Sequence, residues 1–153
     1  MFPDKELADR LQAEYLHLQK VIEDFDGRVI TIKAWSVSFS LVAFLGAFAT
    51  CRSSALLVAS TSALLFWFIE AYWKRYQFVY YRRCNDIELY FRGEGQAIFP
   101  FQIGVTWDEE WENRNFVTVF RMMTWPNVWL PHAIVSAAGI LLFILVRWKL
   151  IAV

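Results

Sequence analysis

The sequence predicts an all-α fold: a polytopic helical membrane protein with three transmembrane helices and a cytoplasmic stalk of two antiparallel helices. Apolar and aromatic residues make up 58% of the 153 residues, above the roughly 45–50% that is usual for soluble domains. The charged residues are concentrated outside three long apolar stretches. Two apolar stripes at helical spacing continue beyond the first two of these stretches, and they predict the stalk.

The three apolar stretches are each close to the roughly 20 residues that cross a hydrocarbon core as a helix. They cover residues 34–51, 55–73 and 128–146. Because only residues 52–54 separate the first two, we expect a tight antiparallel hairpin. The alternative is a soluble protein with buried helices, but so short a chain has too little polar surface to cover three such helices.

The basic residues predict the orientation of the spans. All of the 15 lysines and arginines except Arg52, Arg147 and Lys149 lie before the first span or between the second and third. Basic flanks stay in the cytoplasm. We therefore expect a multi-pass protein of the bacterial inner membrane, with a cytoplasmic N-terminus and with the hairpin tip and the C-terminus outside.

The first stalk helix is predicted over residues 5–33, as an amphipathic cytoplasmic helix that runs directly into the first span. Its apolar stripe follows a 3.5-residue repeat, which is typical of a helix that packs along another helix. Gly27 interrupts this pattern chemically, at about 1 kcal/mol for a glycine in a helix interior. Because the stripe keeps its phase, we expect a continuous or hinged helix.

The second stalk helix is predicted over residues 74–92, as a continuation of the second span that Gly93 and Gly95 stop. The hairpin returns both stalk helices to the same side, so their stripes can pack antiparallel. We name the residues expected to pack there the assembly stripe. It consists of Leu18, Ile22, Phe25, Val29, Tyr76, Tyr80 and Ile87.

Residues 93–127 are predicted to be a loop followed by an interfacial helix over about 107–123. Thr106 and Glu109 have the spacing of a capping box at its start. Its aromatic residues Trp107 and Trp111 suit either the membrane interface or the flank of the stalk. Together with the spans and stalk helices, this segment is expected to belong to a single membrane domain, residues 1–153.

Glu70 is the one formally charged residue inside a predicted span. Carboxylates within membranes often mark proton or ion pathways. A simpler interpretation is that Glu70, near the cytoplasmic end of its span, pairs with Lys74 four residues later. Both interpretations remain open from the sequence.

We find no pattern in the sequence that predicts a catalytic, cofactor or metal site. The nucleophile motif GxSxG, the zinc motif HExxH and the phosphate-loop motif are missing, and His17 and His132 are expected on opposite sides of the bilayer. The same topology separates Cys51 and Cys84, so we expect no disulfide between them. The zero net charge argues against a nucleic-acid partner, which would favour a basic surface.

Small residues recur at spacings of four in the predicted spans, a pattern that allows close helix packing. Packing within one chain and self-association are both compatible with it. The residues are Ser36, Ser40, Ala43, Ala47, Ala59, Ala63, Ala133 and Ala137.

The layout of residues 1–92 is an amphipathic helix, a two-span hairpin with a very short outer turn and a helix that continues inward. This layout resembles the small two-transmembrane effector proteins of bacterial anti-phage systems, of the SMODS-and-SLOG-associating two-transmembrane type. The resemblance implies a role in antiviral defence as a membrane-disrupting effector that a partner sensor triggers. The third predicted span departs from the layout of that family.

These observations favour a non-enzymatic, oligomerising integral membrane protein, an effector or accessory subunit under the control of a cytoplasmic partner. The expected partners are the lipid bilayer and either further copies of the chain or another membrane or cytoplasmic protein. The alternative is a small transporter or ion-channel subunit that uses Glu70.

Overall fold

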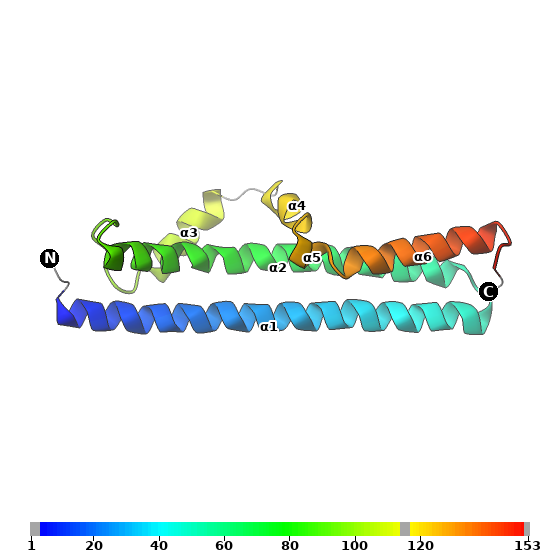
Figure 1. The fold of residues 1–153 in the computed structure, drawn as a ribbon, viewed down its shortest axis with the longest axis horizontal. Helices are drawn as coiled ribbons and strands as arrows, with labels where there is room; N and C mark the ends of the chain where they lie inside the picture. Colours follow the sequence, from blue (N-terminus) through cyan, green and yellow to red (C-terminus); the bar gives the residue numbers. More distant parts are fainter. Residues whose placement is uncertain (1–3, 114–116, 152–153) are drawn as a thin grey trace. The chain divides into compact units, whose positions relative to one another are not determined.

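The computed structural model describes residues 4–113 and 117–151, and the regular structure in these ranges is entirely α-helical (Figure 1). The predicted all-α class is confirmed. The helices, with the labels of Figure 1, are α1 (Lys5–Thr50), α2 (Ser54–Arg92), α3 (Ile103–Asn113), α4 (Val117–Met123), α5 (Pro126–Trp129) and α6 (His132–Arg147).

Helices α1 and α2 are long and apolar enough to cross a membrane. The apolar helix α6 is shorter, at 16 residues, and reaches only about 24 Å against the roughly 30 Å of a hydrocarbon core. The third span was expected as one helix over residues 128–146. Instead, Pro131 is the N-cap of α6, and the separate short helix α5 precedes it.

The chain divides into two compact units. The first unit comprises Met1–Gly27 and Trp73–Thr118, and the second comprises Arg28–Tyr72 and Val119–Val153. The first unit contains most of the residues predicted for the stalk, whereas residues 28–33, predicted as part of the first stalk helix, belong to the second unit. Helix α1 stays helical through Gly27, as its unbroken stripe predicted.

The core of the first unit joins the two stripes. Leu11, Leu18 and Ile22 of α1 form a buried cluster with Cys84 and Ile87 of α2. The N-terminal part of α1 therefore packs against the C-terminal part of α2, as expected for antiparallel helices. Apolar contacts of this kind hold helices together by removing their surfaces from water.

Helix α3 belongs to the first unit and packs on α2 through its aromatic face. The ring of Trp111 stacks on Tyr76 with 4.8 Å between the ring centroids, and the Arg75 guanidinium carbon lies 3.8 Å from the centroid of the Trp111 ring. Trp111 therefore packs on α2, and a location of α3 at the membrane interface stays a prediction.

The boundaries between residues 93 and 127 differ from those expected. Helix α2 ends at Arg92, and Gly93 follows with a φ of +77°, as the glycine predicted. Helix α3 begins at Ile103, so Thr106 lies inside it and donates to the carbonyl of Gln102. A threonine hydroxyl that bonds back along its own helix cannot cap that helix. Within the range 107–123 expected for one helix, the structure describes α3 up to Asn113 and α4 from Val117, and residues 114–116 lie outside the described ranges.

Small side chains form the interior of the second unit. Ser36 and Ser40 of α1 and Ala59 and Ala63 of α2 are completely buried. Helix α6 packs closest at Gly139, where an added Cβ would lie 2.2 Å from the hydroxyl of Ser60. The packed face of α6 consists of His132, Ser136 and Gly139, and the predicted small residues Ala133 and Ala137 do not belong to it.

Candidate functional site: the Glu70 cluster

Glu70 lies in the α2 part of the second unit and is 0% exposed. Its carboxylate has two partners, one on each oxygen. The ammonium group of Lys33 donates to Oε1 at 2.5 Å, and Nε2 of His132 lies 2.9 Å from Oε2. The other ring nitrogen of His132, Nδ1, lies 2.7 Å from the hydroxyl of Ser36. We call Lys33, Ser36, Glu70 and His132 the Glu70 cluster.

Three helices bring the cluster together. Lys33 and Ser36 are three residues apart on α1, so they share one face of that helix. Glu70 extends from α2, and His132 is the first residue of α6. His132 is also completely buried, so its hydrogen bonds replace those that water would otherwise make.

Lys33 also binds the backbone that leads into α6. Its ammonium group donates to the carbonyl oxygens of Asn127 at 2.7 Å and Leu130 at 3.0 Å. Lys33 therefore uses its three donors on one carboxylate and two carbonyls. Pro131 has no N–H with which to bond the Asn127 carbonyl, and Leu130 lies between the two helices, so this lysine stabilises the corner between α5 and α6.

The expected pairing of Glu70 with Lys74 is wrong. Lys74 donates to the carboxylate of Asp26 at 2.7 Å and to Oε1 of Gln77 at 2.6 Å, within the first unit. A spacing of four residues on a helix allows an ion pair to form. A completely buried carboxylate, however, forms its hydrogen bonds with the groups that surround it. For Glu70 these groups come from α1 and α6.

The carboxylate that forms an ion pair with Lys74 is that of Asp26. Partial burial acts to raise the pKa of Asp26, but the interactions with Lys74 and Gln77 outweigh burial and hold that pKa below its usual value. The ionised form of Asp26 is therefore the form that the first unit stabilises.

The Glu70 cluster can accommodate a change of one proton without losing its hydrogen bonds. With a neutral imidazole, Nε2–H donates to Glu70 and Nδ1 accepts from the Ser36 hydroxyl. With an imidazolium, both nitrogens donate, and the Ser36 hydroxyl turns to accept. Within the described ranges, no group of three or more histidine, cysteine or acidic residues is arranged to hold a metal ion.

The assembly stripe is largely used within the chain. Leu18, Ile22 and Ile87 belong to the core of the first unit, against which Tyr80 packs. The rings of Phe25 and Tyr80 lie with their centroids 5.8 Å apart. Two members lie elsewhere: Tyr76 stacks on Trp111, and Val29 is buried in the second unit. A role of these residues in assembly between copies stays a prediction.

Lys33, Ser36 and His132 were missed as partners of Glu70, although the sequence contained a signal for them. Lys33 is the last charge before the first apolar stretch, and a tight hairpin places the residues before that stretch beside the end of the second. His132 is the one titratable side chain of the third stretch.

No model of a protein family, no curated protein and no solved structure matches the chain.

Proposed function

We propose that the chain is a small subunit of a membrane transporter or ion channel, in which the Glu70 cluster binds and releases protons. One observation supports this function above others. Glu70 and His132 are both completely buried, and they face each other at 2.9 Å. Ionisable groups are costly in an apolar environment, and in membrane proteins they commonly mark proton or ion pathways.

The proposed proton site has a candidate route that leads away from it. The buried hydroxyl of Ser36 contacts His132, and Ser40 is one helical turn further along α1. In the same unit the Ser60 hydroxyl oxygen lies 3.1 Å from the carbonyl oxygens of both Leu56 and Ser136, which share its one hydrogen. A proton would pass along these hydroxyls only if they exchanged their present acceptors, as a chain of hydrogen bonds requires.

The proposed topology is that of the bacterial inner membrane, with the first unit in the cytoplasm and the tip near Cys51 outside. Its support is the distribution of lysine and arginine together with the two helices that are long enough to span. Exposed large apolar side chains on the second unit suit contact with lipid. They include Leu41, Val42, Leu45, Val58 and Leu65.

The function is tested with purified protein in liposomes that contain a trapped pH indicator. A potassium gradient with valinomycin supplies the driving potential. We expect Glu70→Gln to abolish proton flux, because the amide keeps the size of the side chain but cannot carry the negative charge. Glu23→Gln, at an exposed carboxylate of α1, is the matched control and should leave flux intact. Equal flux through the Glu70→Gln and unmodified proteins would refute the proposal, as would an unmodified protein that carries none.

A second candidate is an oligomerising membrane effector or accessory subunit that a cytoplasmic partner controls. Exposed apolar side chains in the first unit favour it, because they have no evident use in an isolated chain. Phe99 and Phe101 carry this observation. Since Ile22 and Ile87 are already buried inside the chain, assembly between copies would use a surface other than the assembly stripe.

A further inference from the structure

The turn Phe99–Pro100–Phe101, between α2 and α3, displays two aromatic rings to solvent. Phe99 is 71% and Phe101 is 75% exposed. Phe101 has a φ of +64°, which is a left-handed backbone conformation that a bulky side chain seldom adopts. Residues in such conformations persist where their surroundings impose them, and they concentrate at functional sites.

A buried ion pair imposes this conformation. Arg83 of α2 donates from Nε to Oε1 of Glu14 of α1 at 2.7 Å, and both side chains are buried. Nη2 of Arg83 also donates to the carbonyl of Phe99 at 2.6 Å, and Oε2 of Glu14 accepts from the amide of Phe101 at 2.9 Å. The backbone is thus fixed on both sides of Pro100. The two rings extend into solvent from this fixed backbone and contribute nothing to the apolar core, and exposed aromatic side chains are typical anchors of interfaces.

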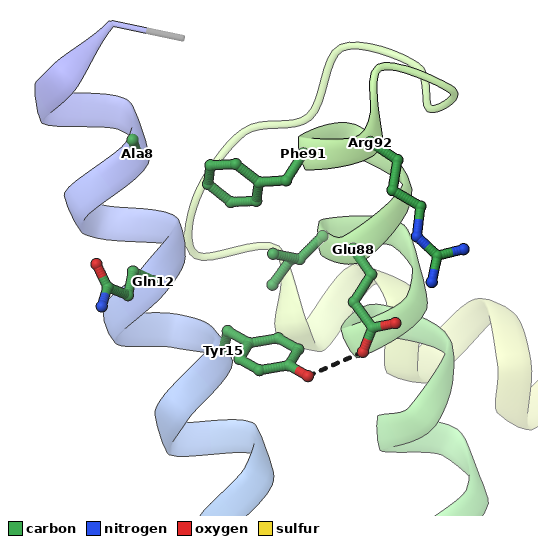
Figure 2. Close-up of a pocket in the computed structure, with 7 residues that line it drawn as sticks. Ala8, Gln12, Tyr15, Glu88, Phe91 and Arg92 are labelled. Atoms are coloured by element: carbon green, nitrogen blue, oxygen red, sulfur yellow. Dashed lines mark hydrogen bonds between the residues drawn. The ribbon is translucent and has the colours of Figure 1, made fainter. Parts of the chain in front are cut away.

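A pocket in the same unit matches such an anchor in chemistry and size. It lies between the beginning of α1 and the end of α2, and its volume is about 420 Å³, within the roughly 300–1,000 Å³ of ordinary binding pockets. In Figure 2, the ring of Phe91 is directed toward α1, and Tyr15 reaches across to Glu88. The Tyr15 hydroxyl donates to Glu88 at 2.8 Å, so one oxygen of that carboxylate already has a donor. The lining residues are Ala8, Gln12, Tyr15, Ile87, Glu88, Phe91 and Arg92.

We propose that the Phe99–Phe101 turn of one copy docks into this pocket on a second copy. The turn of the same chain is fixed by Glu14 and Arg83, whereas the turn of another copy can approach the pocket freely. Charge also favours this occupant, because exposed Asp108 and Glu109 follow the turn and exposed Arg92 borders the pocket, while Glu88, the other charged residue of the lining, accepts from Tyr15.

The contact joins two different surfaces, so each copy in a row offers one turn and one pocket. Such a head-to-tail contact produces rings or open chains of copies. The acidic residues after the turn disfavour an anionic membrane surface as the alternative occupant. Assembly by this contact does not depend on proton binding at Glu70, so Glu70→Gln should assemble normally.

Cross-linking between two differently tagged chains tests the contact. Both carry Cys51→Ser, and the remaining native thiol is Cys84, which is buried. One chain carries Gln12→Cys in the pocket. The other carries Gly104→Cys, near the turn, where an added Cβ meets nothing within 4 Å. After co-reconstitution and treatment with a bismaleimide, we expect a covalent heterodimer.

The control pair replaces Gln12→Cys with His17→Cys, at an exposed position of α1 outside the pocket, and should cross-link weakly. Adding Phe99→Ser and Phe101→Ser to the Gly104→Cys chain should abolish the heterodimer. Three results would overturn the proposal. They are equal cross-linking by the two pairs, undiminished cross-linking after the serine substitutions, and cross-links confined to single chains.

Light scattering of the protein in detergent gives an independent measure. Phe99→Ser with Phe101→Ser should lower the mass to that of a monomer, while Leu16→Ser, which removes another exposed apolar side chain of the first unit, should not. Phe101→Gly relieves the backbone conformation and removes the ring, so it should also weaken assembly if the ring is the anchor. A monomeric unmodified protein, or a doubly substituted protein of undiminished mass, contradicts the proposed contact.

Discussion

The contact between Glu70 and His132 can be measured by a double-mutant cycle. The single variants are Glu70→Leu and His132→Leu, and the double variant carries both. Leucine cannot form a hydrogen bond, so each single variant leaves one buried partner without its main contact. The double variant removes both polar groups together and leaves an apolar contact in their place.

The structure gives the expected magnitudes. In Glu70→Leu, the buried His132 loses its Nε2 partner, at about 1–3 kcal/mol for an unsatisfied buried group. Lys33 loses its carboxylate but keeps the carbonyls of Asn127 and Leu130, and its side chain is 25% exposed. The total loss should be about 3 kcal/mol, at the lower end of the range for breaking a buried ion pair. The double variant should be less destabilised than the sum of the single variants by about 2 kcal/mol.

Unfolding in mixed detergent micelles, followed by circular dichroism, measures these free energies. Glu23→Leu, at an exposed position on α1, is the control and should change stability by no more than about 0.5 kcal/mol. If the effects of Glu70→Leu and His132→Leu add to within about 0.5 kcal/mol, the two groups are energetically independent. The cluster would then be a coincidence of position, and the proton site proposed from it would fail.

Two further predictions concern packing and thiol reactivity. Gly139→Ala should destabilise the protein by about 1–3 kcal/mol, because the added Cβ would overlap the Ser60 hydroxyl. The control, Gly46→Ala, should not destabilise it, because nothing lies within 4 Å of a Cβ at that position. The same unfolding measurement compares the two variants. In spheroplasts, a membrane-impermeant maleimide at pH 8 should label the exposed Cys51, which the proposed topology places outside. In detergent, where the reagent reaches both sides of the protein, it should still spare Cys84, because burial, followed by the charges of Glu88 and Glu14, raises the pKa of Cys84 to about 11 and leaves only about 0.1% of it as thiolate. Since folding raises the pKa of Cys84, the folded protein binds this proton more tightly than the unfolded protein and loses stability as the pH rises from about 9 to 11. Labelling of Cys84 as rapid as that of Cys51 would contradict the burial of Cys84. Absence of labelling at Cys51 would contradict the proposed topology.

The two long helices were predictable because their signals are local. Arg52, Ser53 and Ser54 interrupt the apolar sequence, and the structure turns between Thr50 and Ser54. Gly93 permits the positive φ that follows α2. The pairing of the stripes was predictable for a related reason: a hairpin with so short a turn allows few alternatives to antiparallel packing.

The corner before α6 was not predictable from hydropathy. The stretch at 128–146 is apolar apart from His132, and Pro131 at the end of α5 is also compatible with the first turn of a helix, so the sequence indicates one helix. Residues 127 and 130 instead give their carbonyls to Lys33, a residue almost a hundred positions earlier. A local pattern cannot reveal a backbone interruption that a distant side chain stabilises.

The two irregular corners described above are stabilised in the same way. Lys33 of α1 supplies donors to the carbonyls before α6, and Glu14 of α1, with Arg83, holds the backbone around Pro100. In sequence, Glu14 and Lys33 look like ordinary solvated charges on the polar side of a helix. Irregular backbone needs hydrogen-bond partners wherever water is excluded, and a charged side chain on a neighbouring helix is a strong one. A charged residue beside an apolar stripe should therefore be considered as a hydrogen-bond partner for distant backbone before it is interpreted as a solvated surface charge. In this chain, Lys33 belongs to the proposed proton site, and Glu14 holds the turn that we propose as a docking segment.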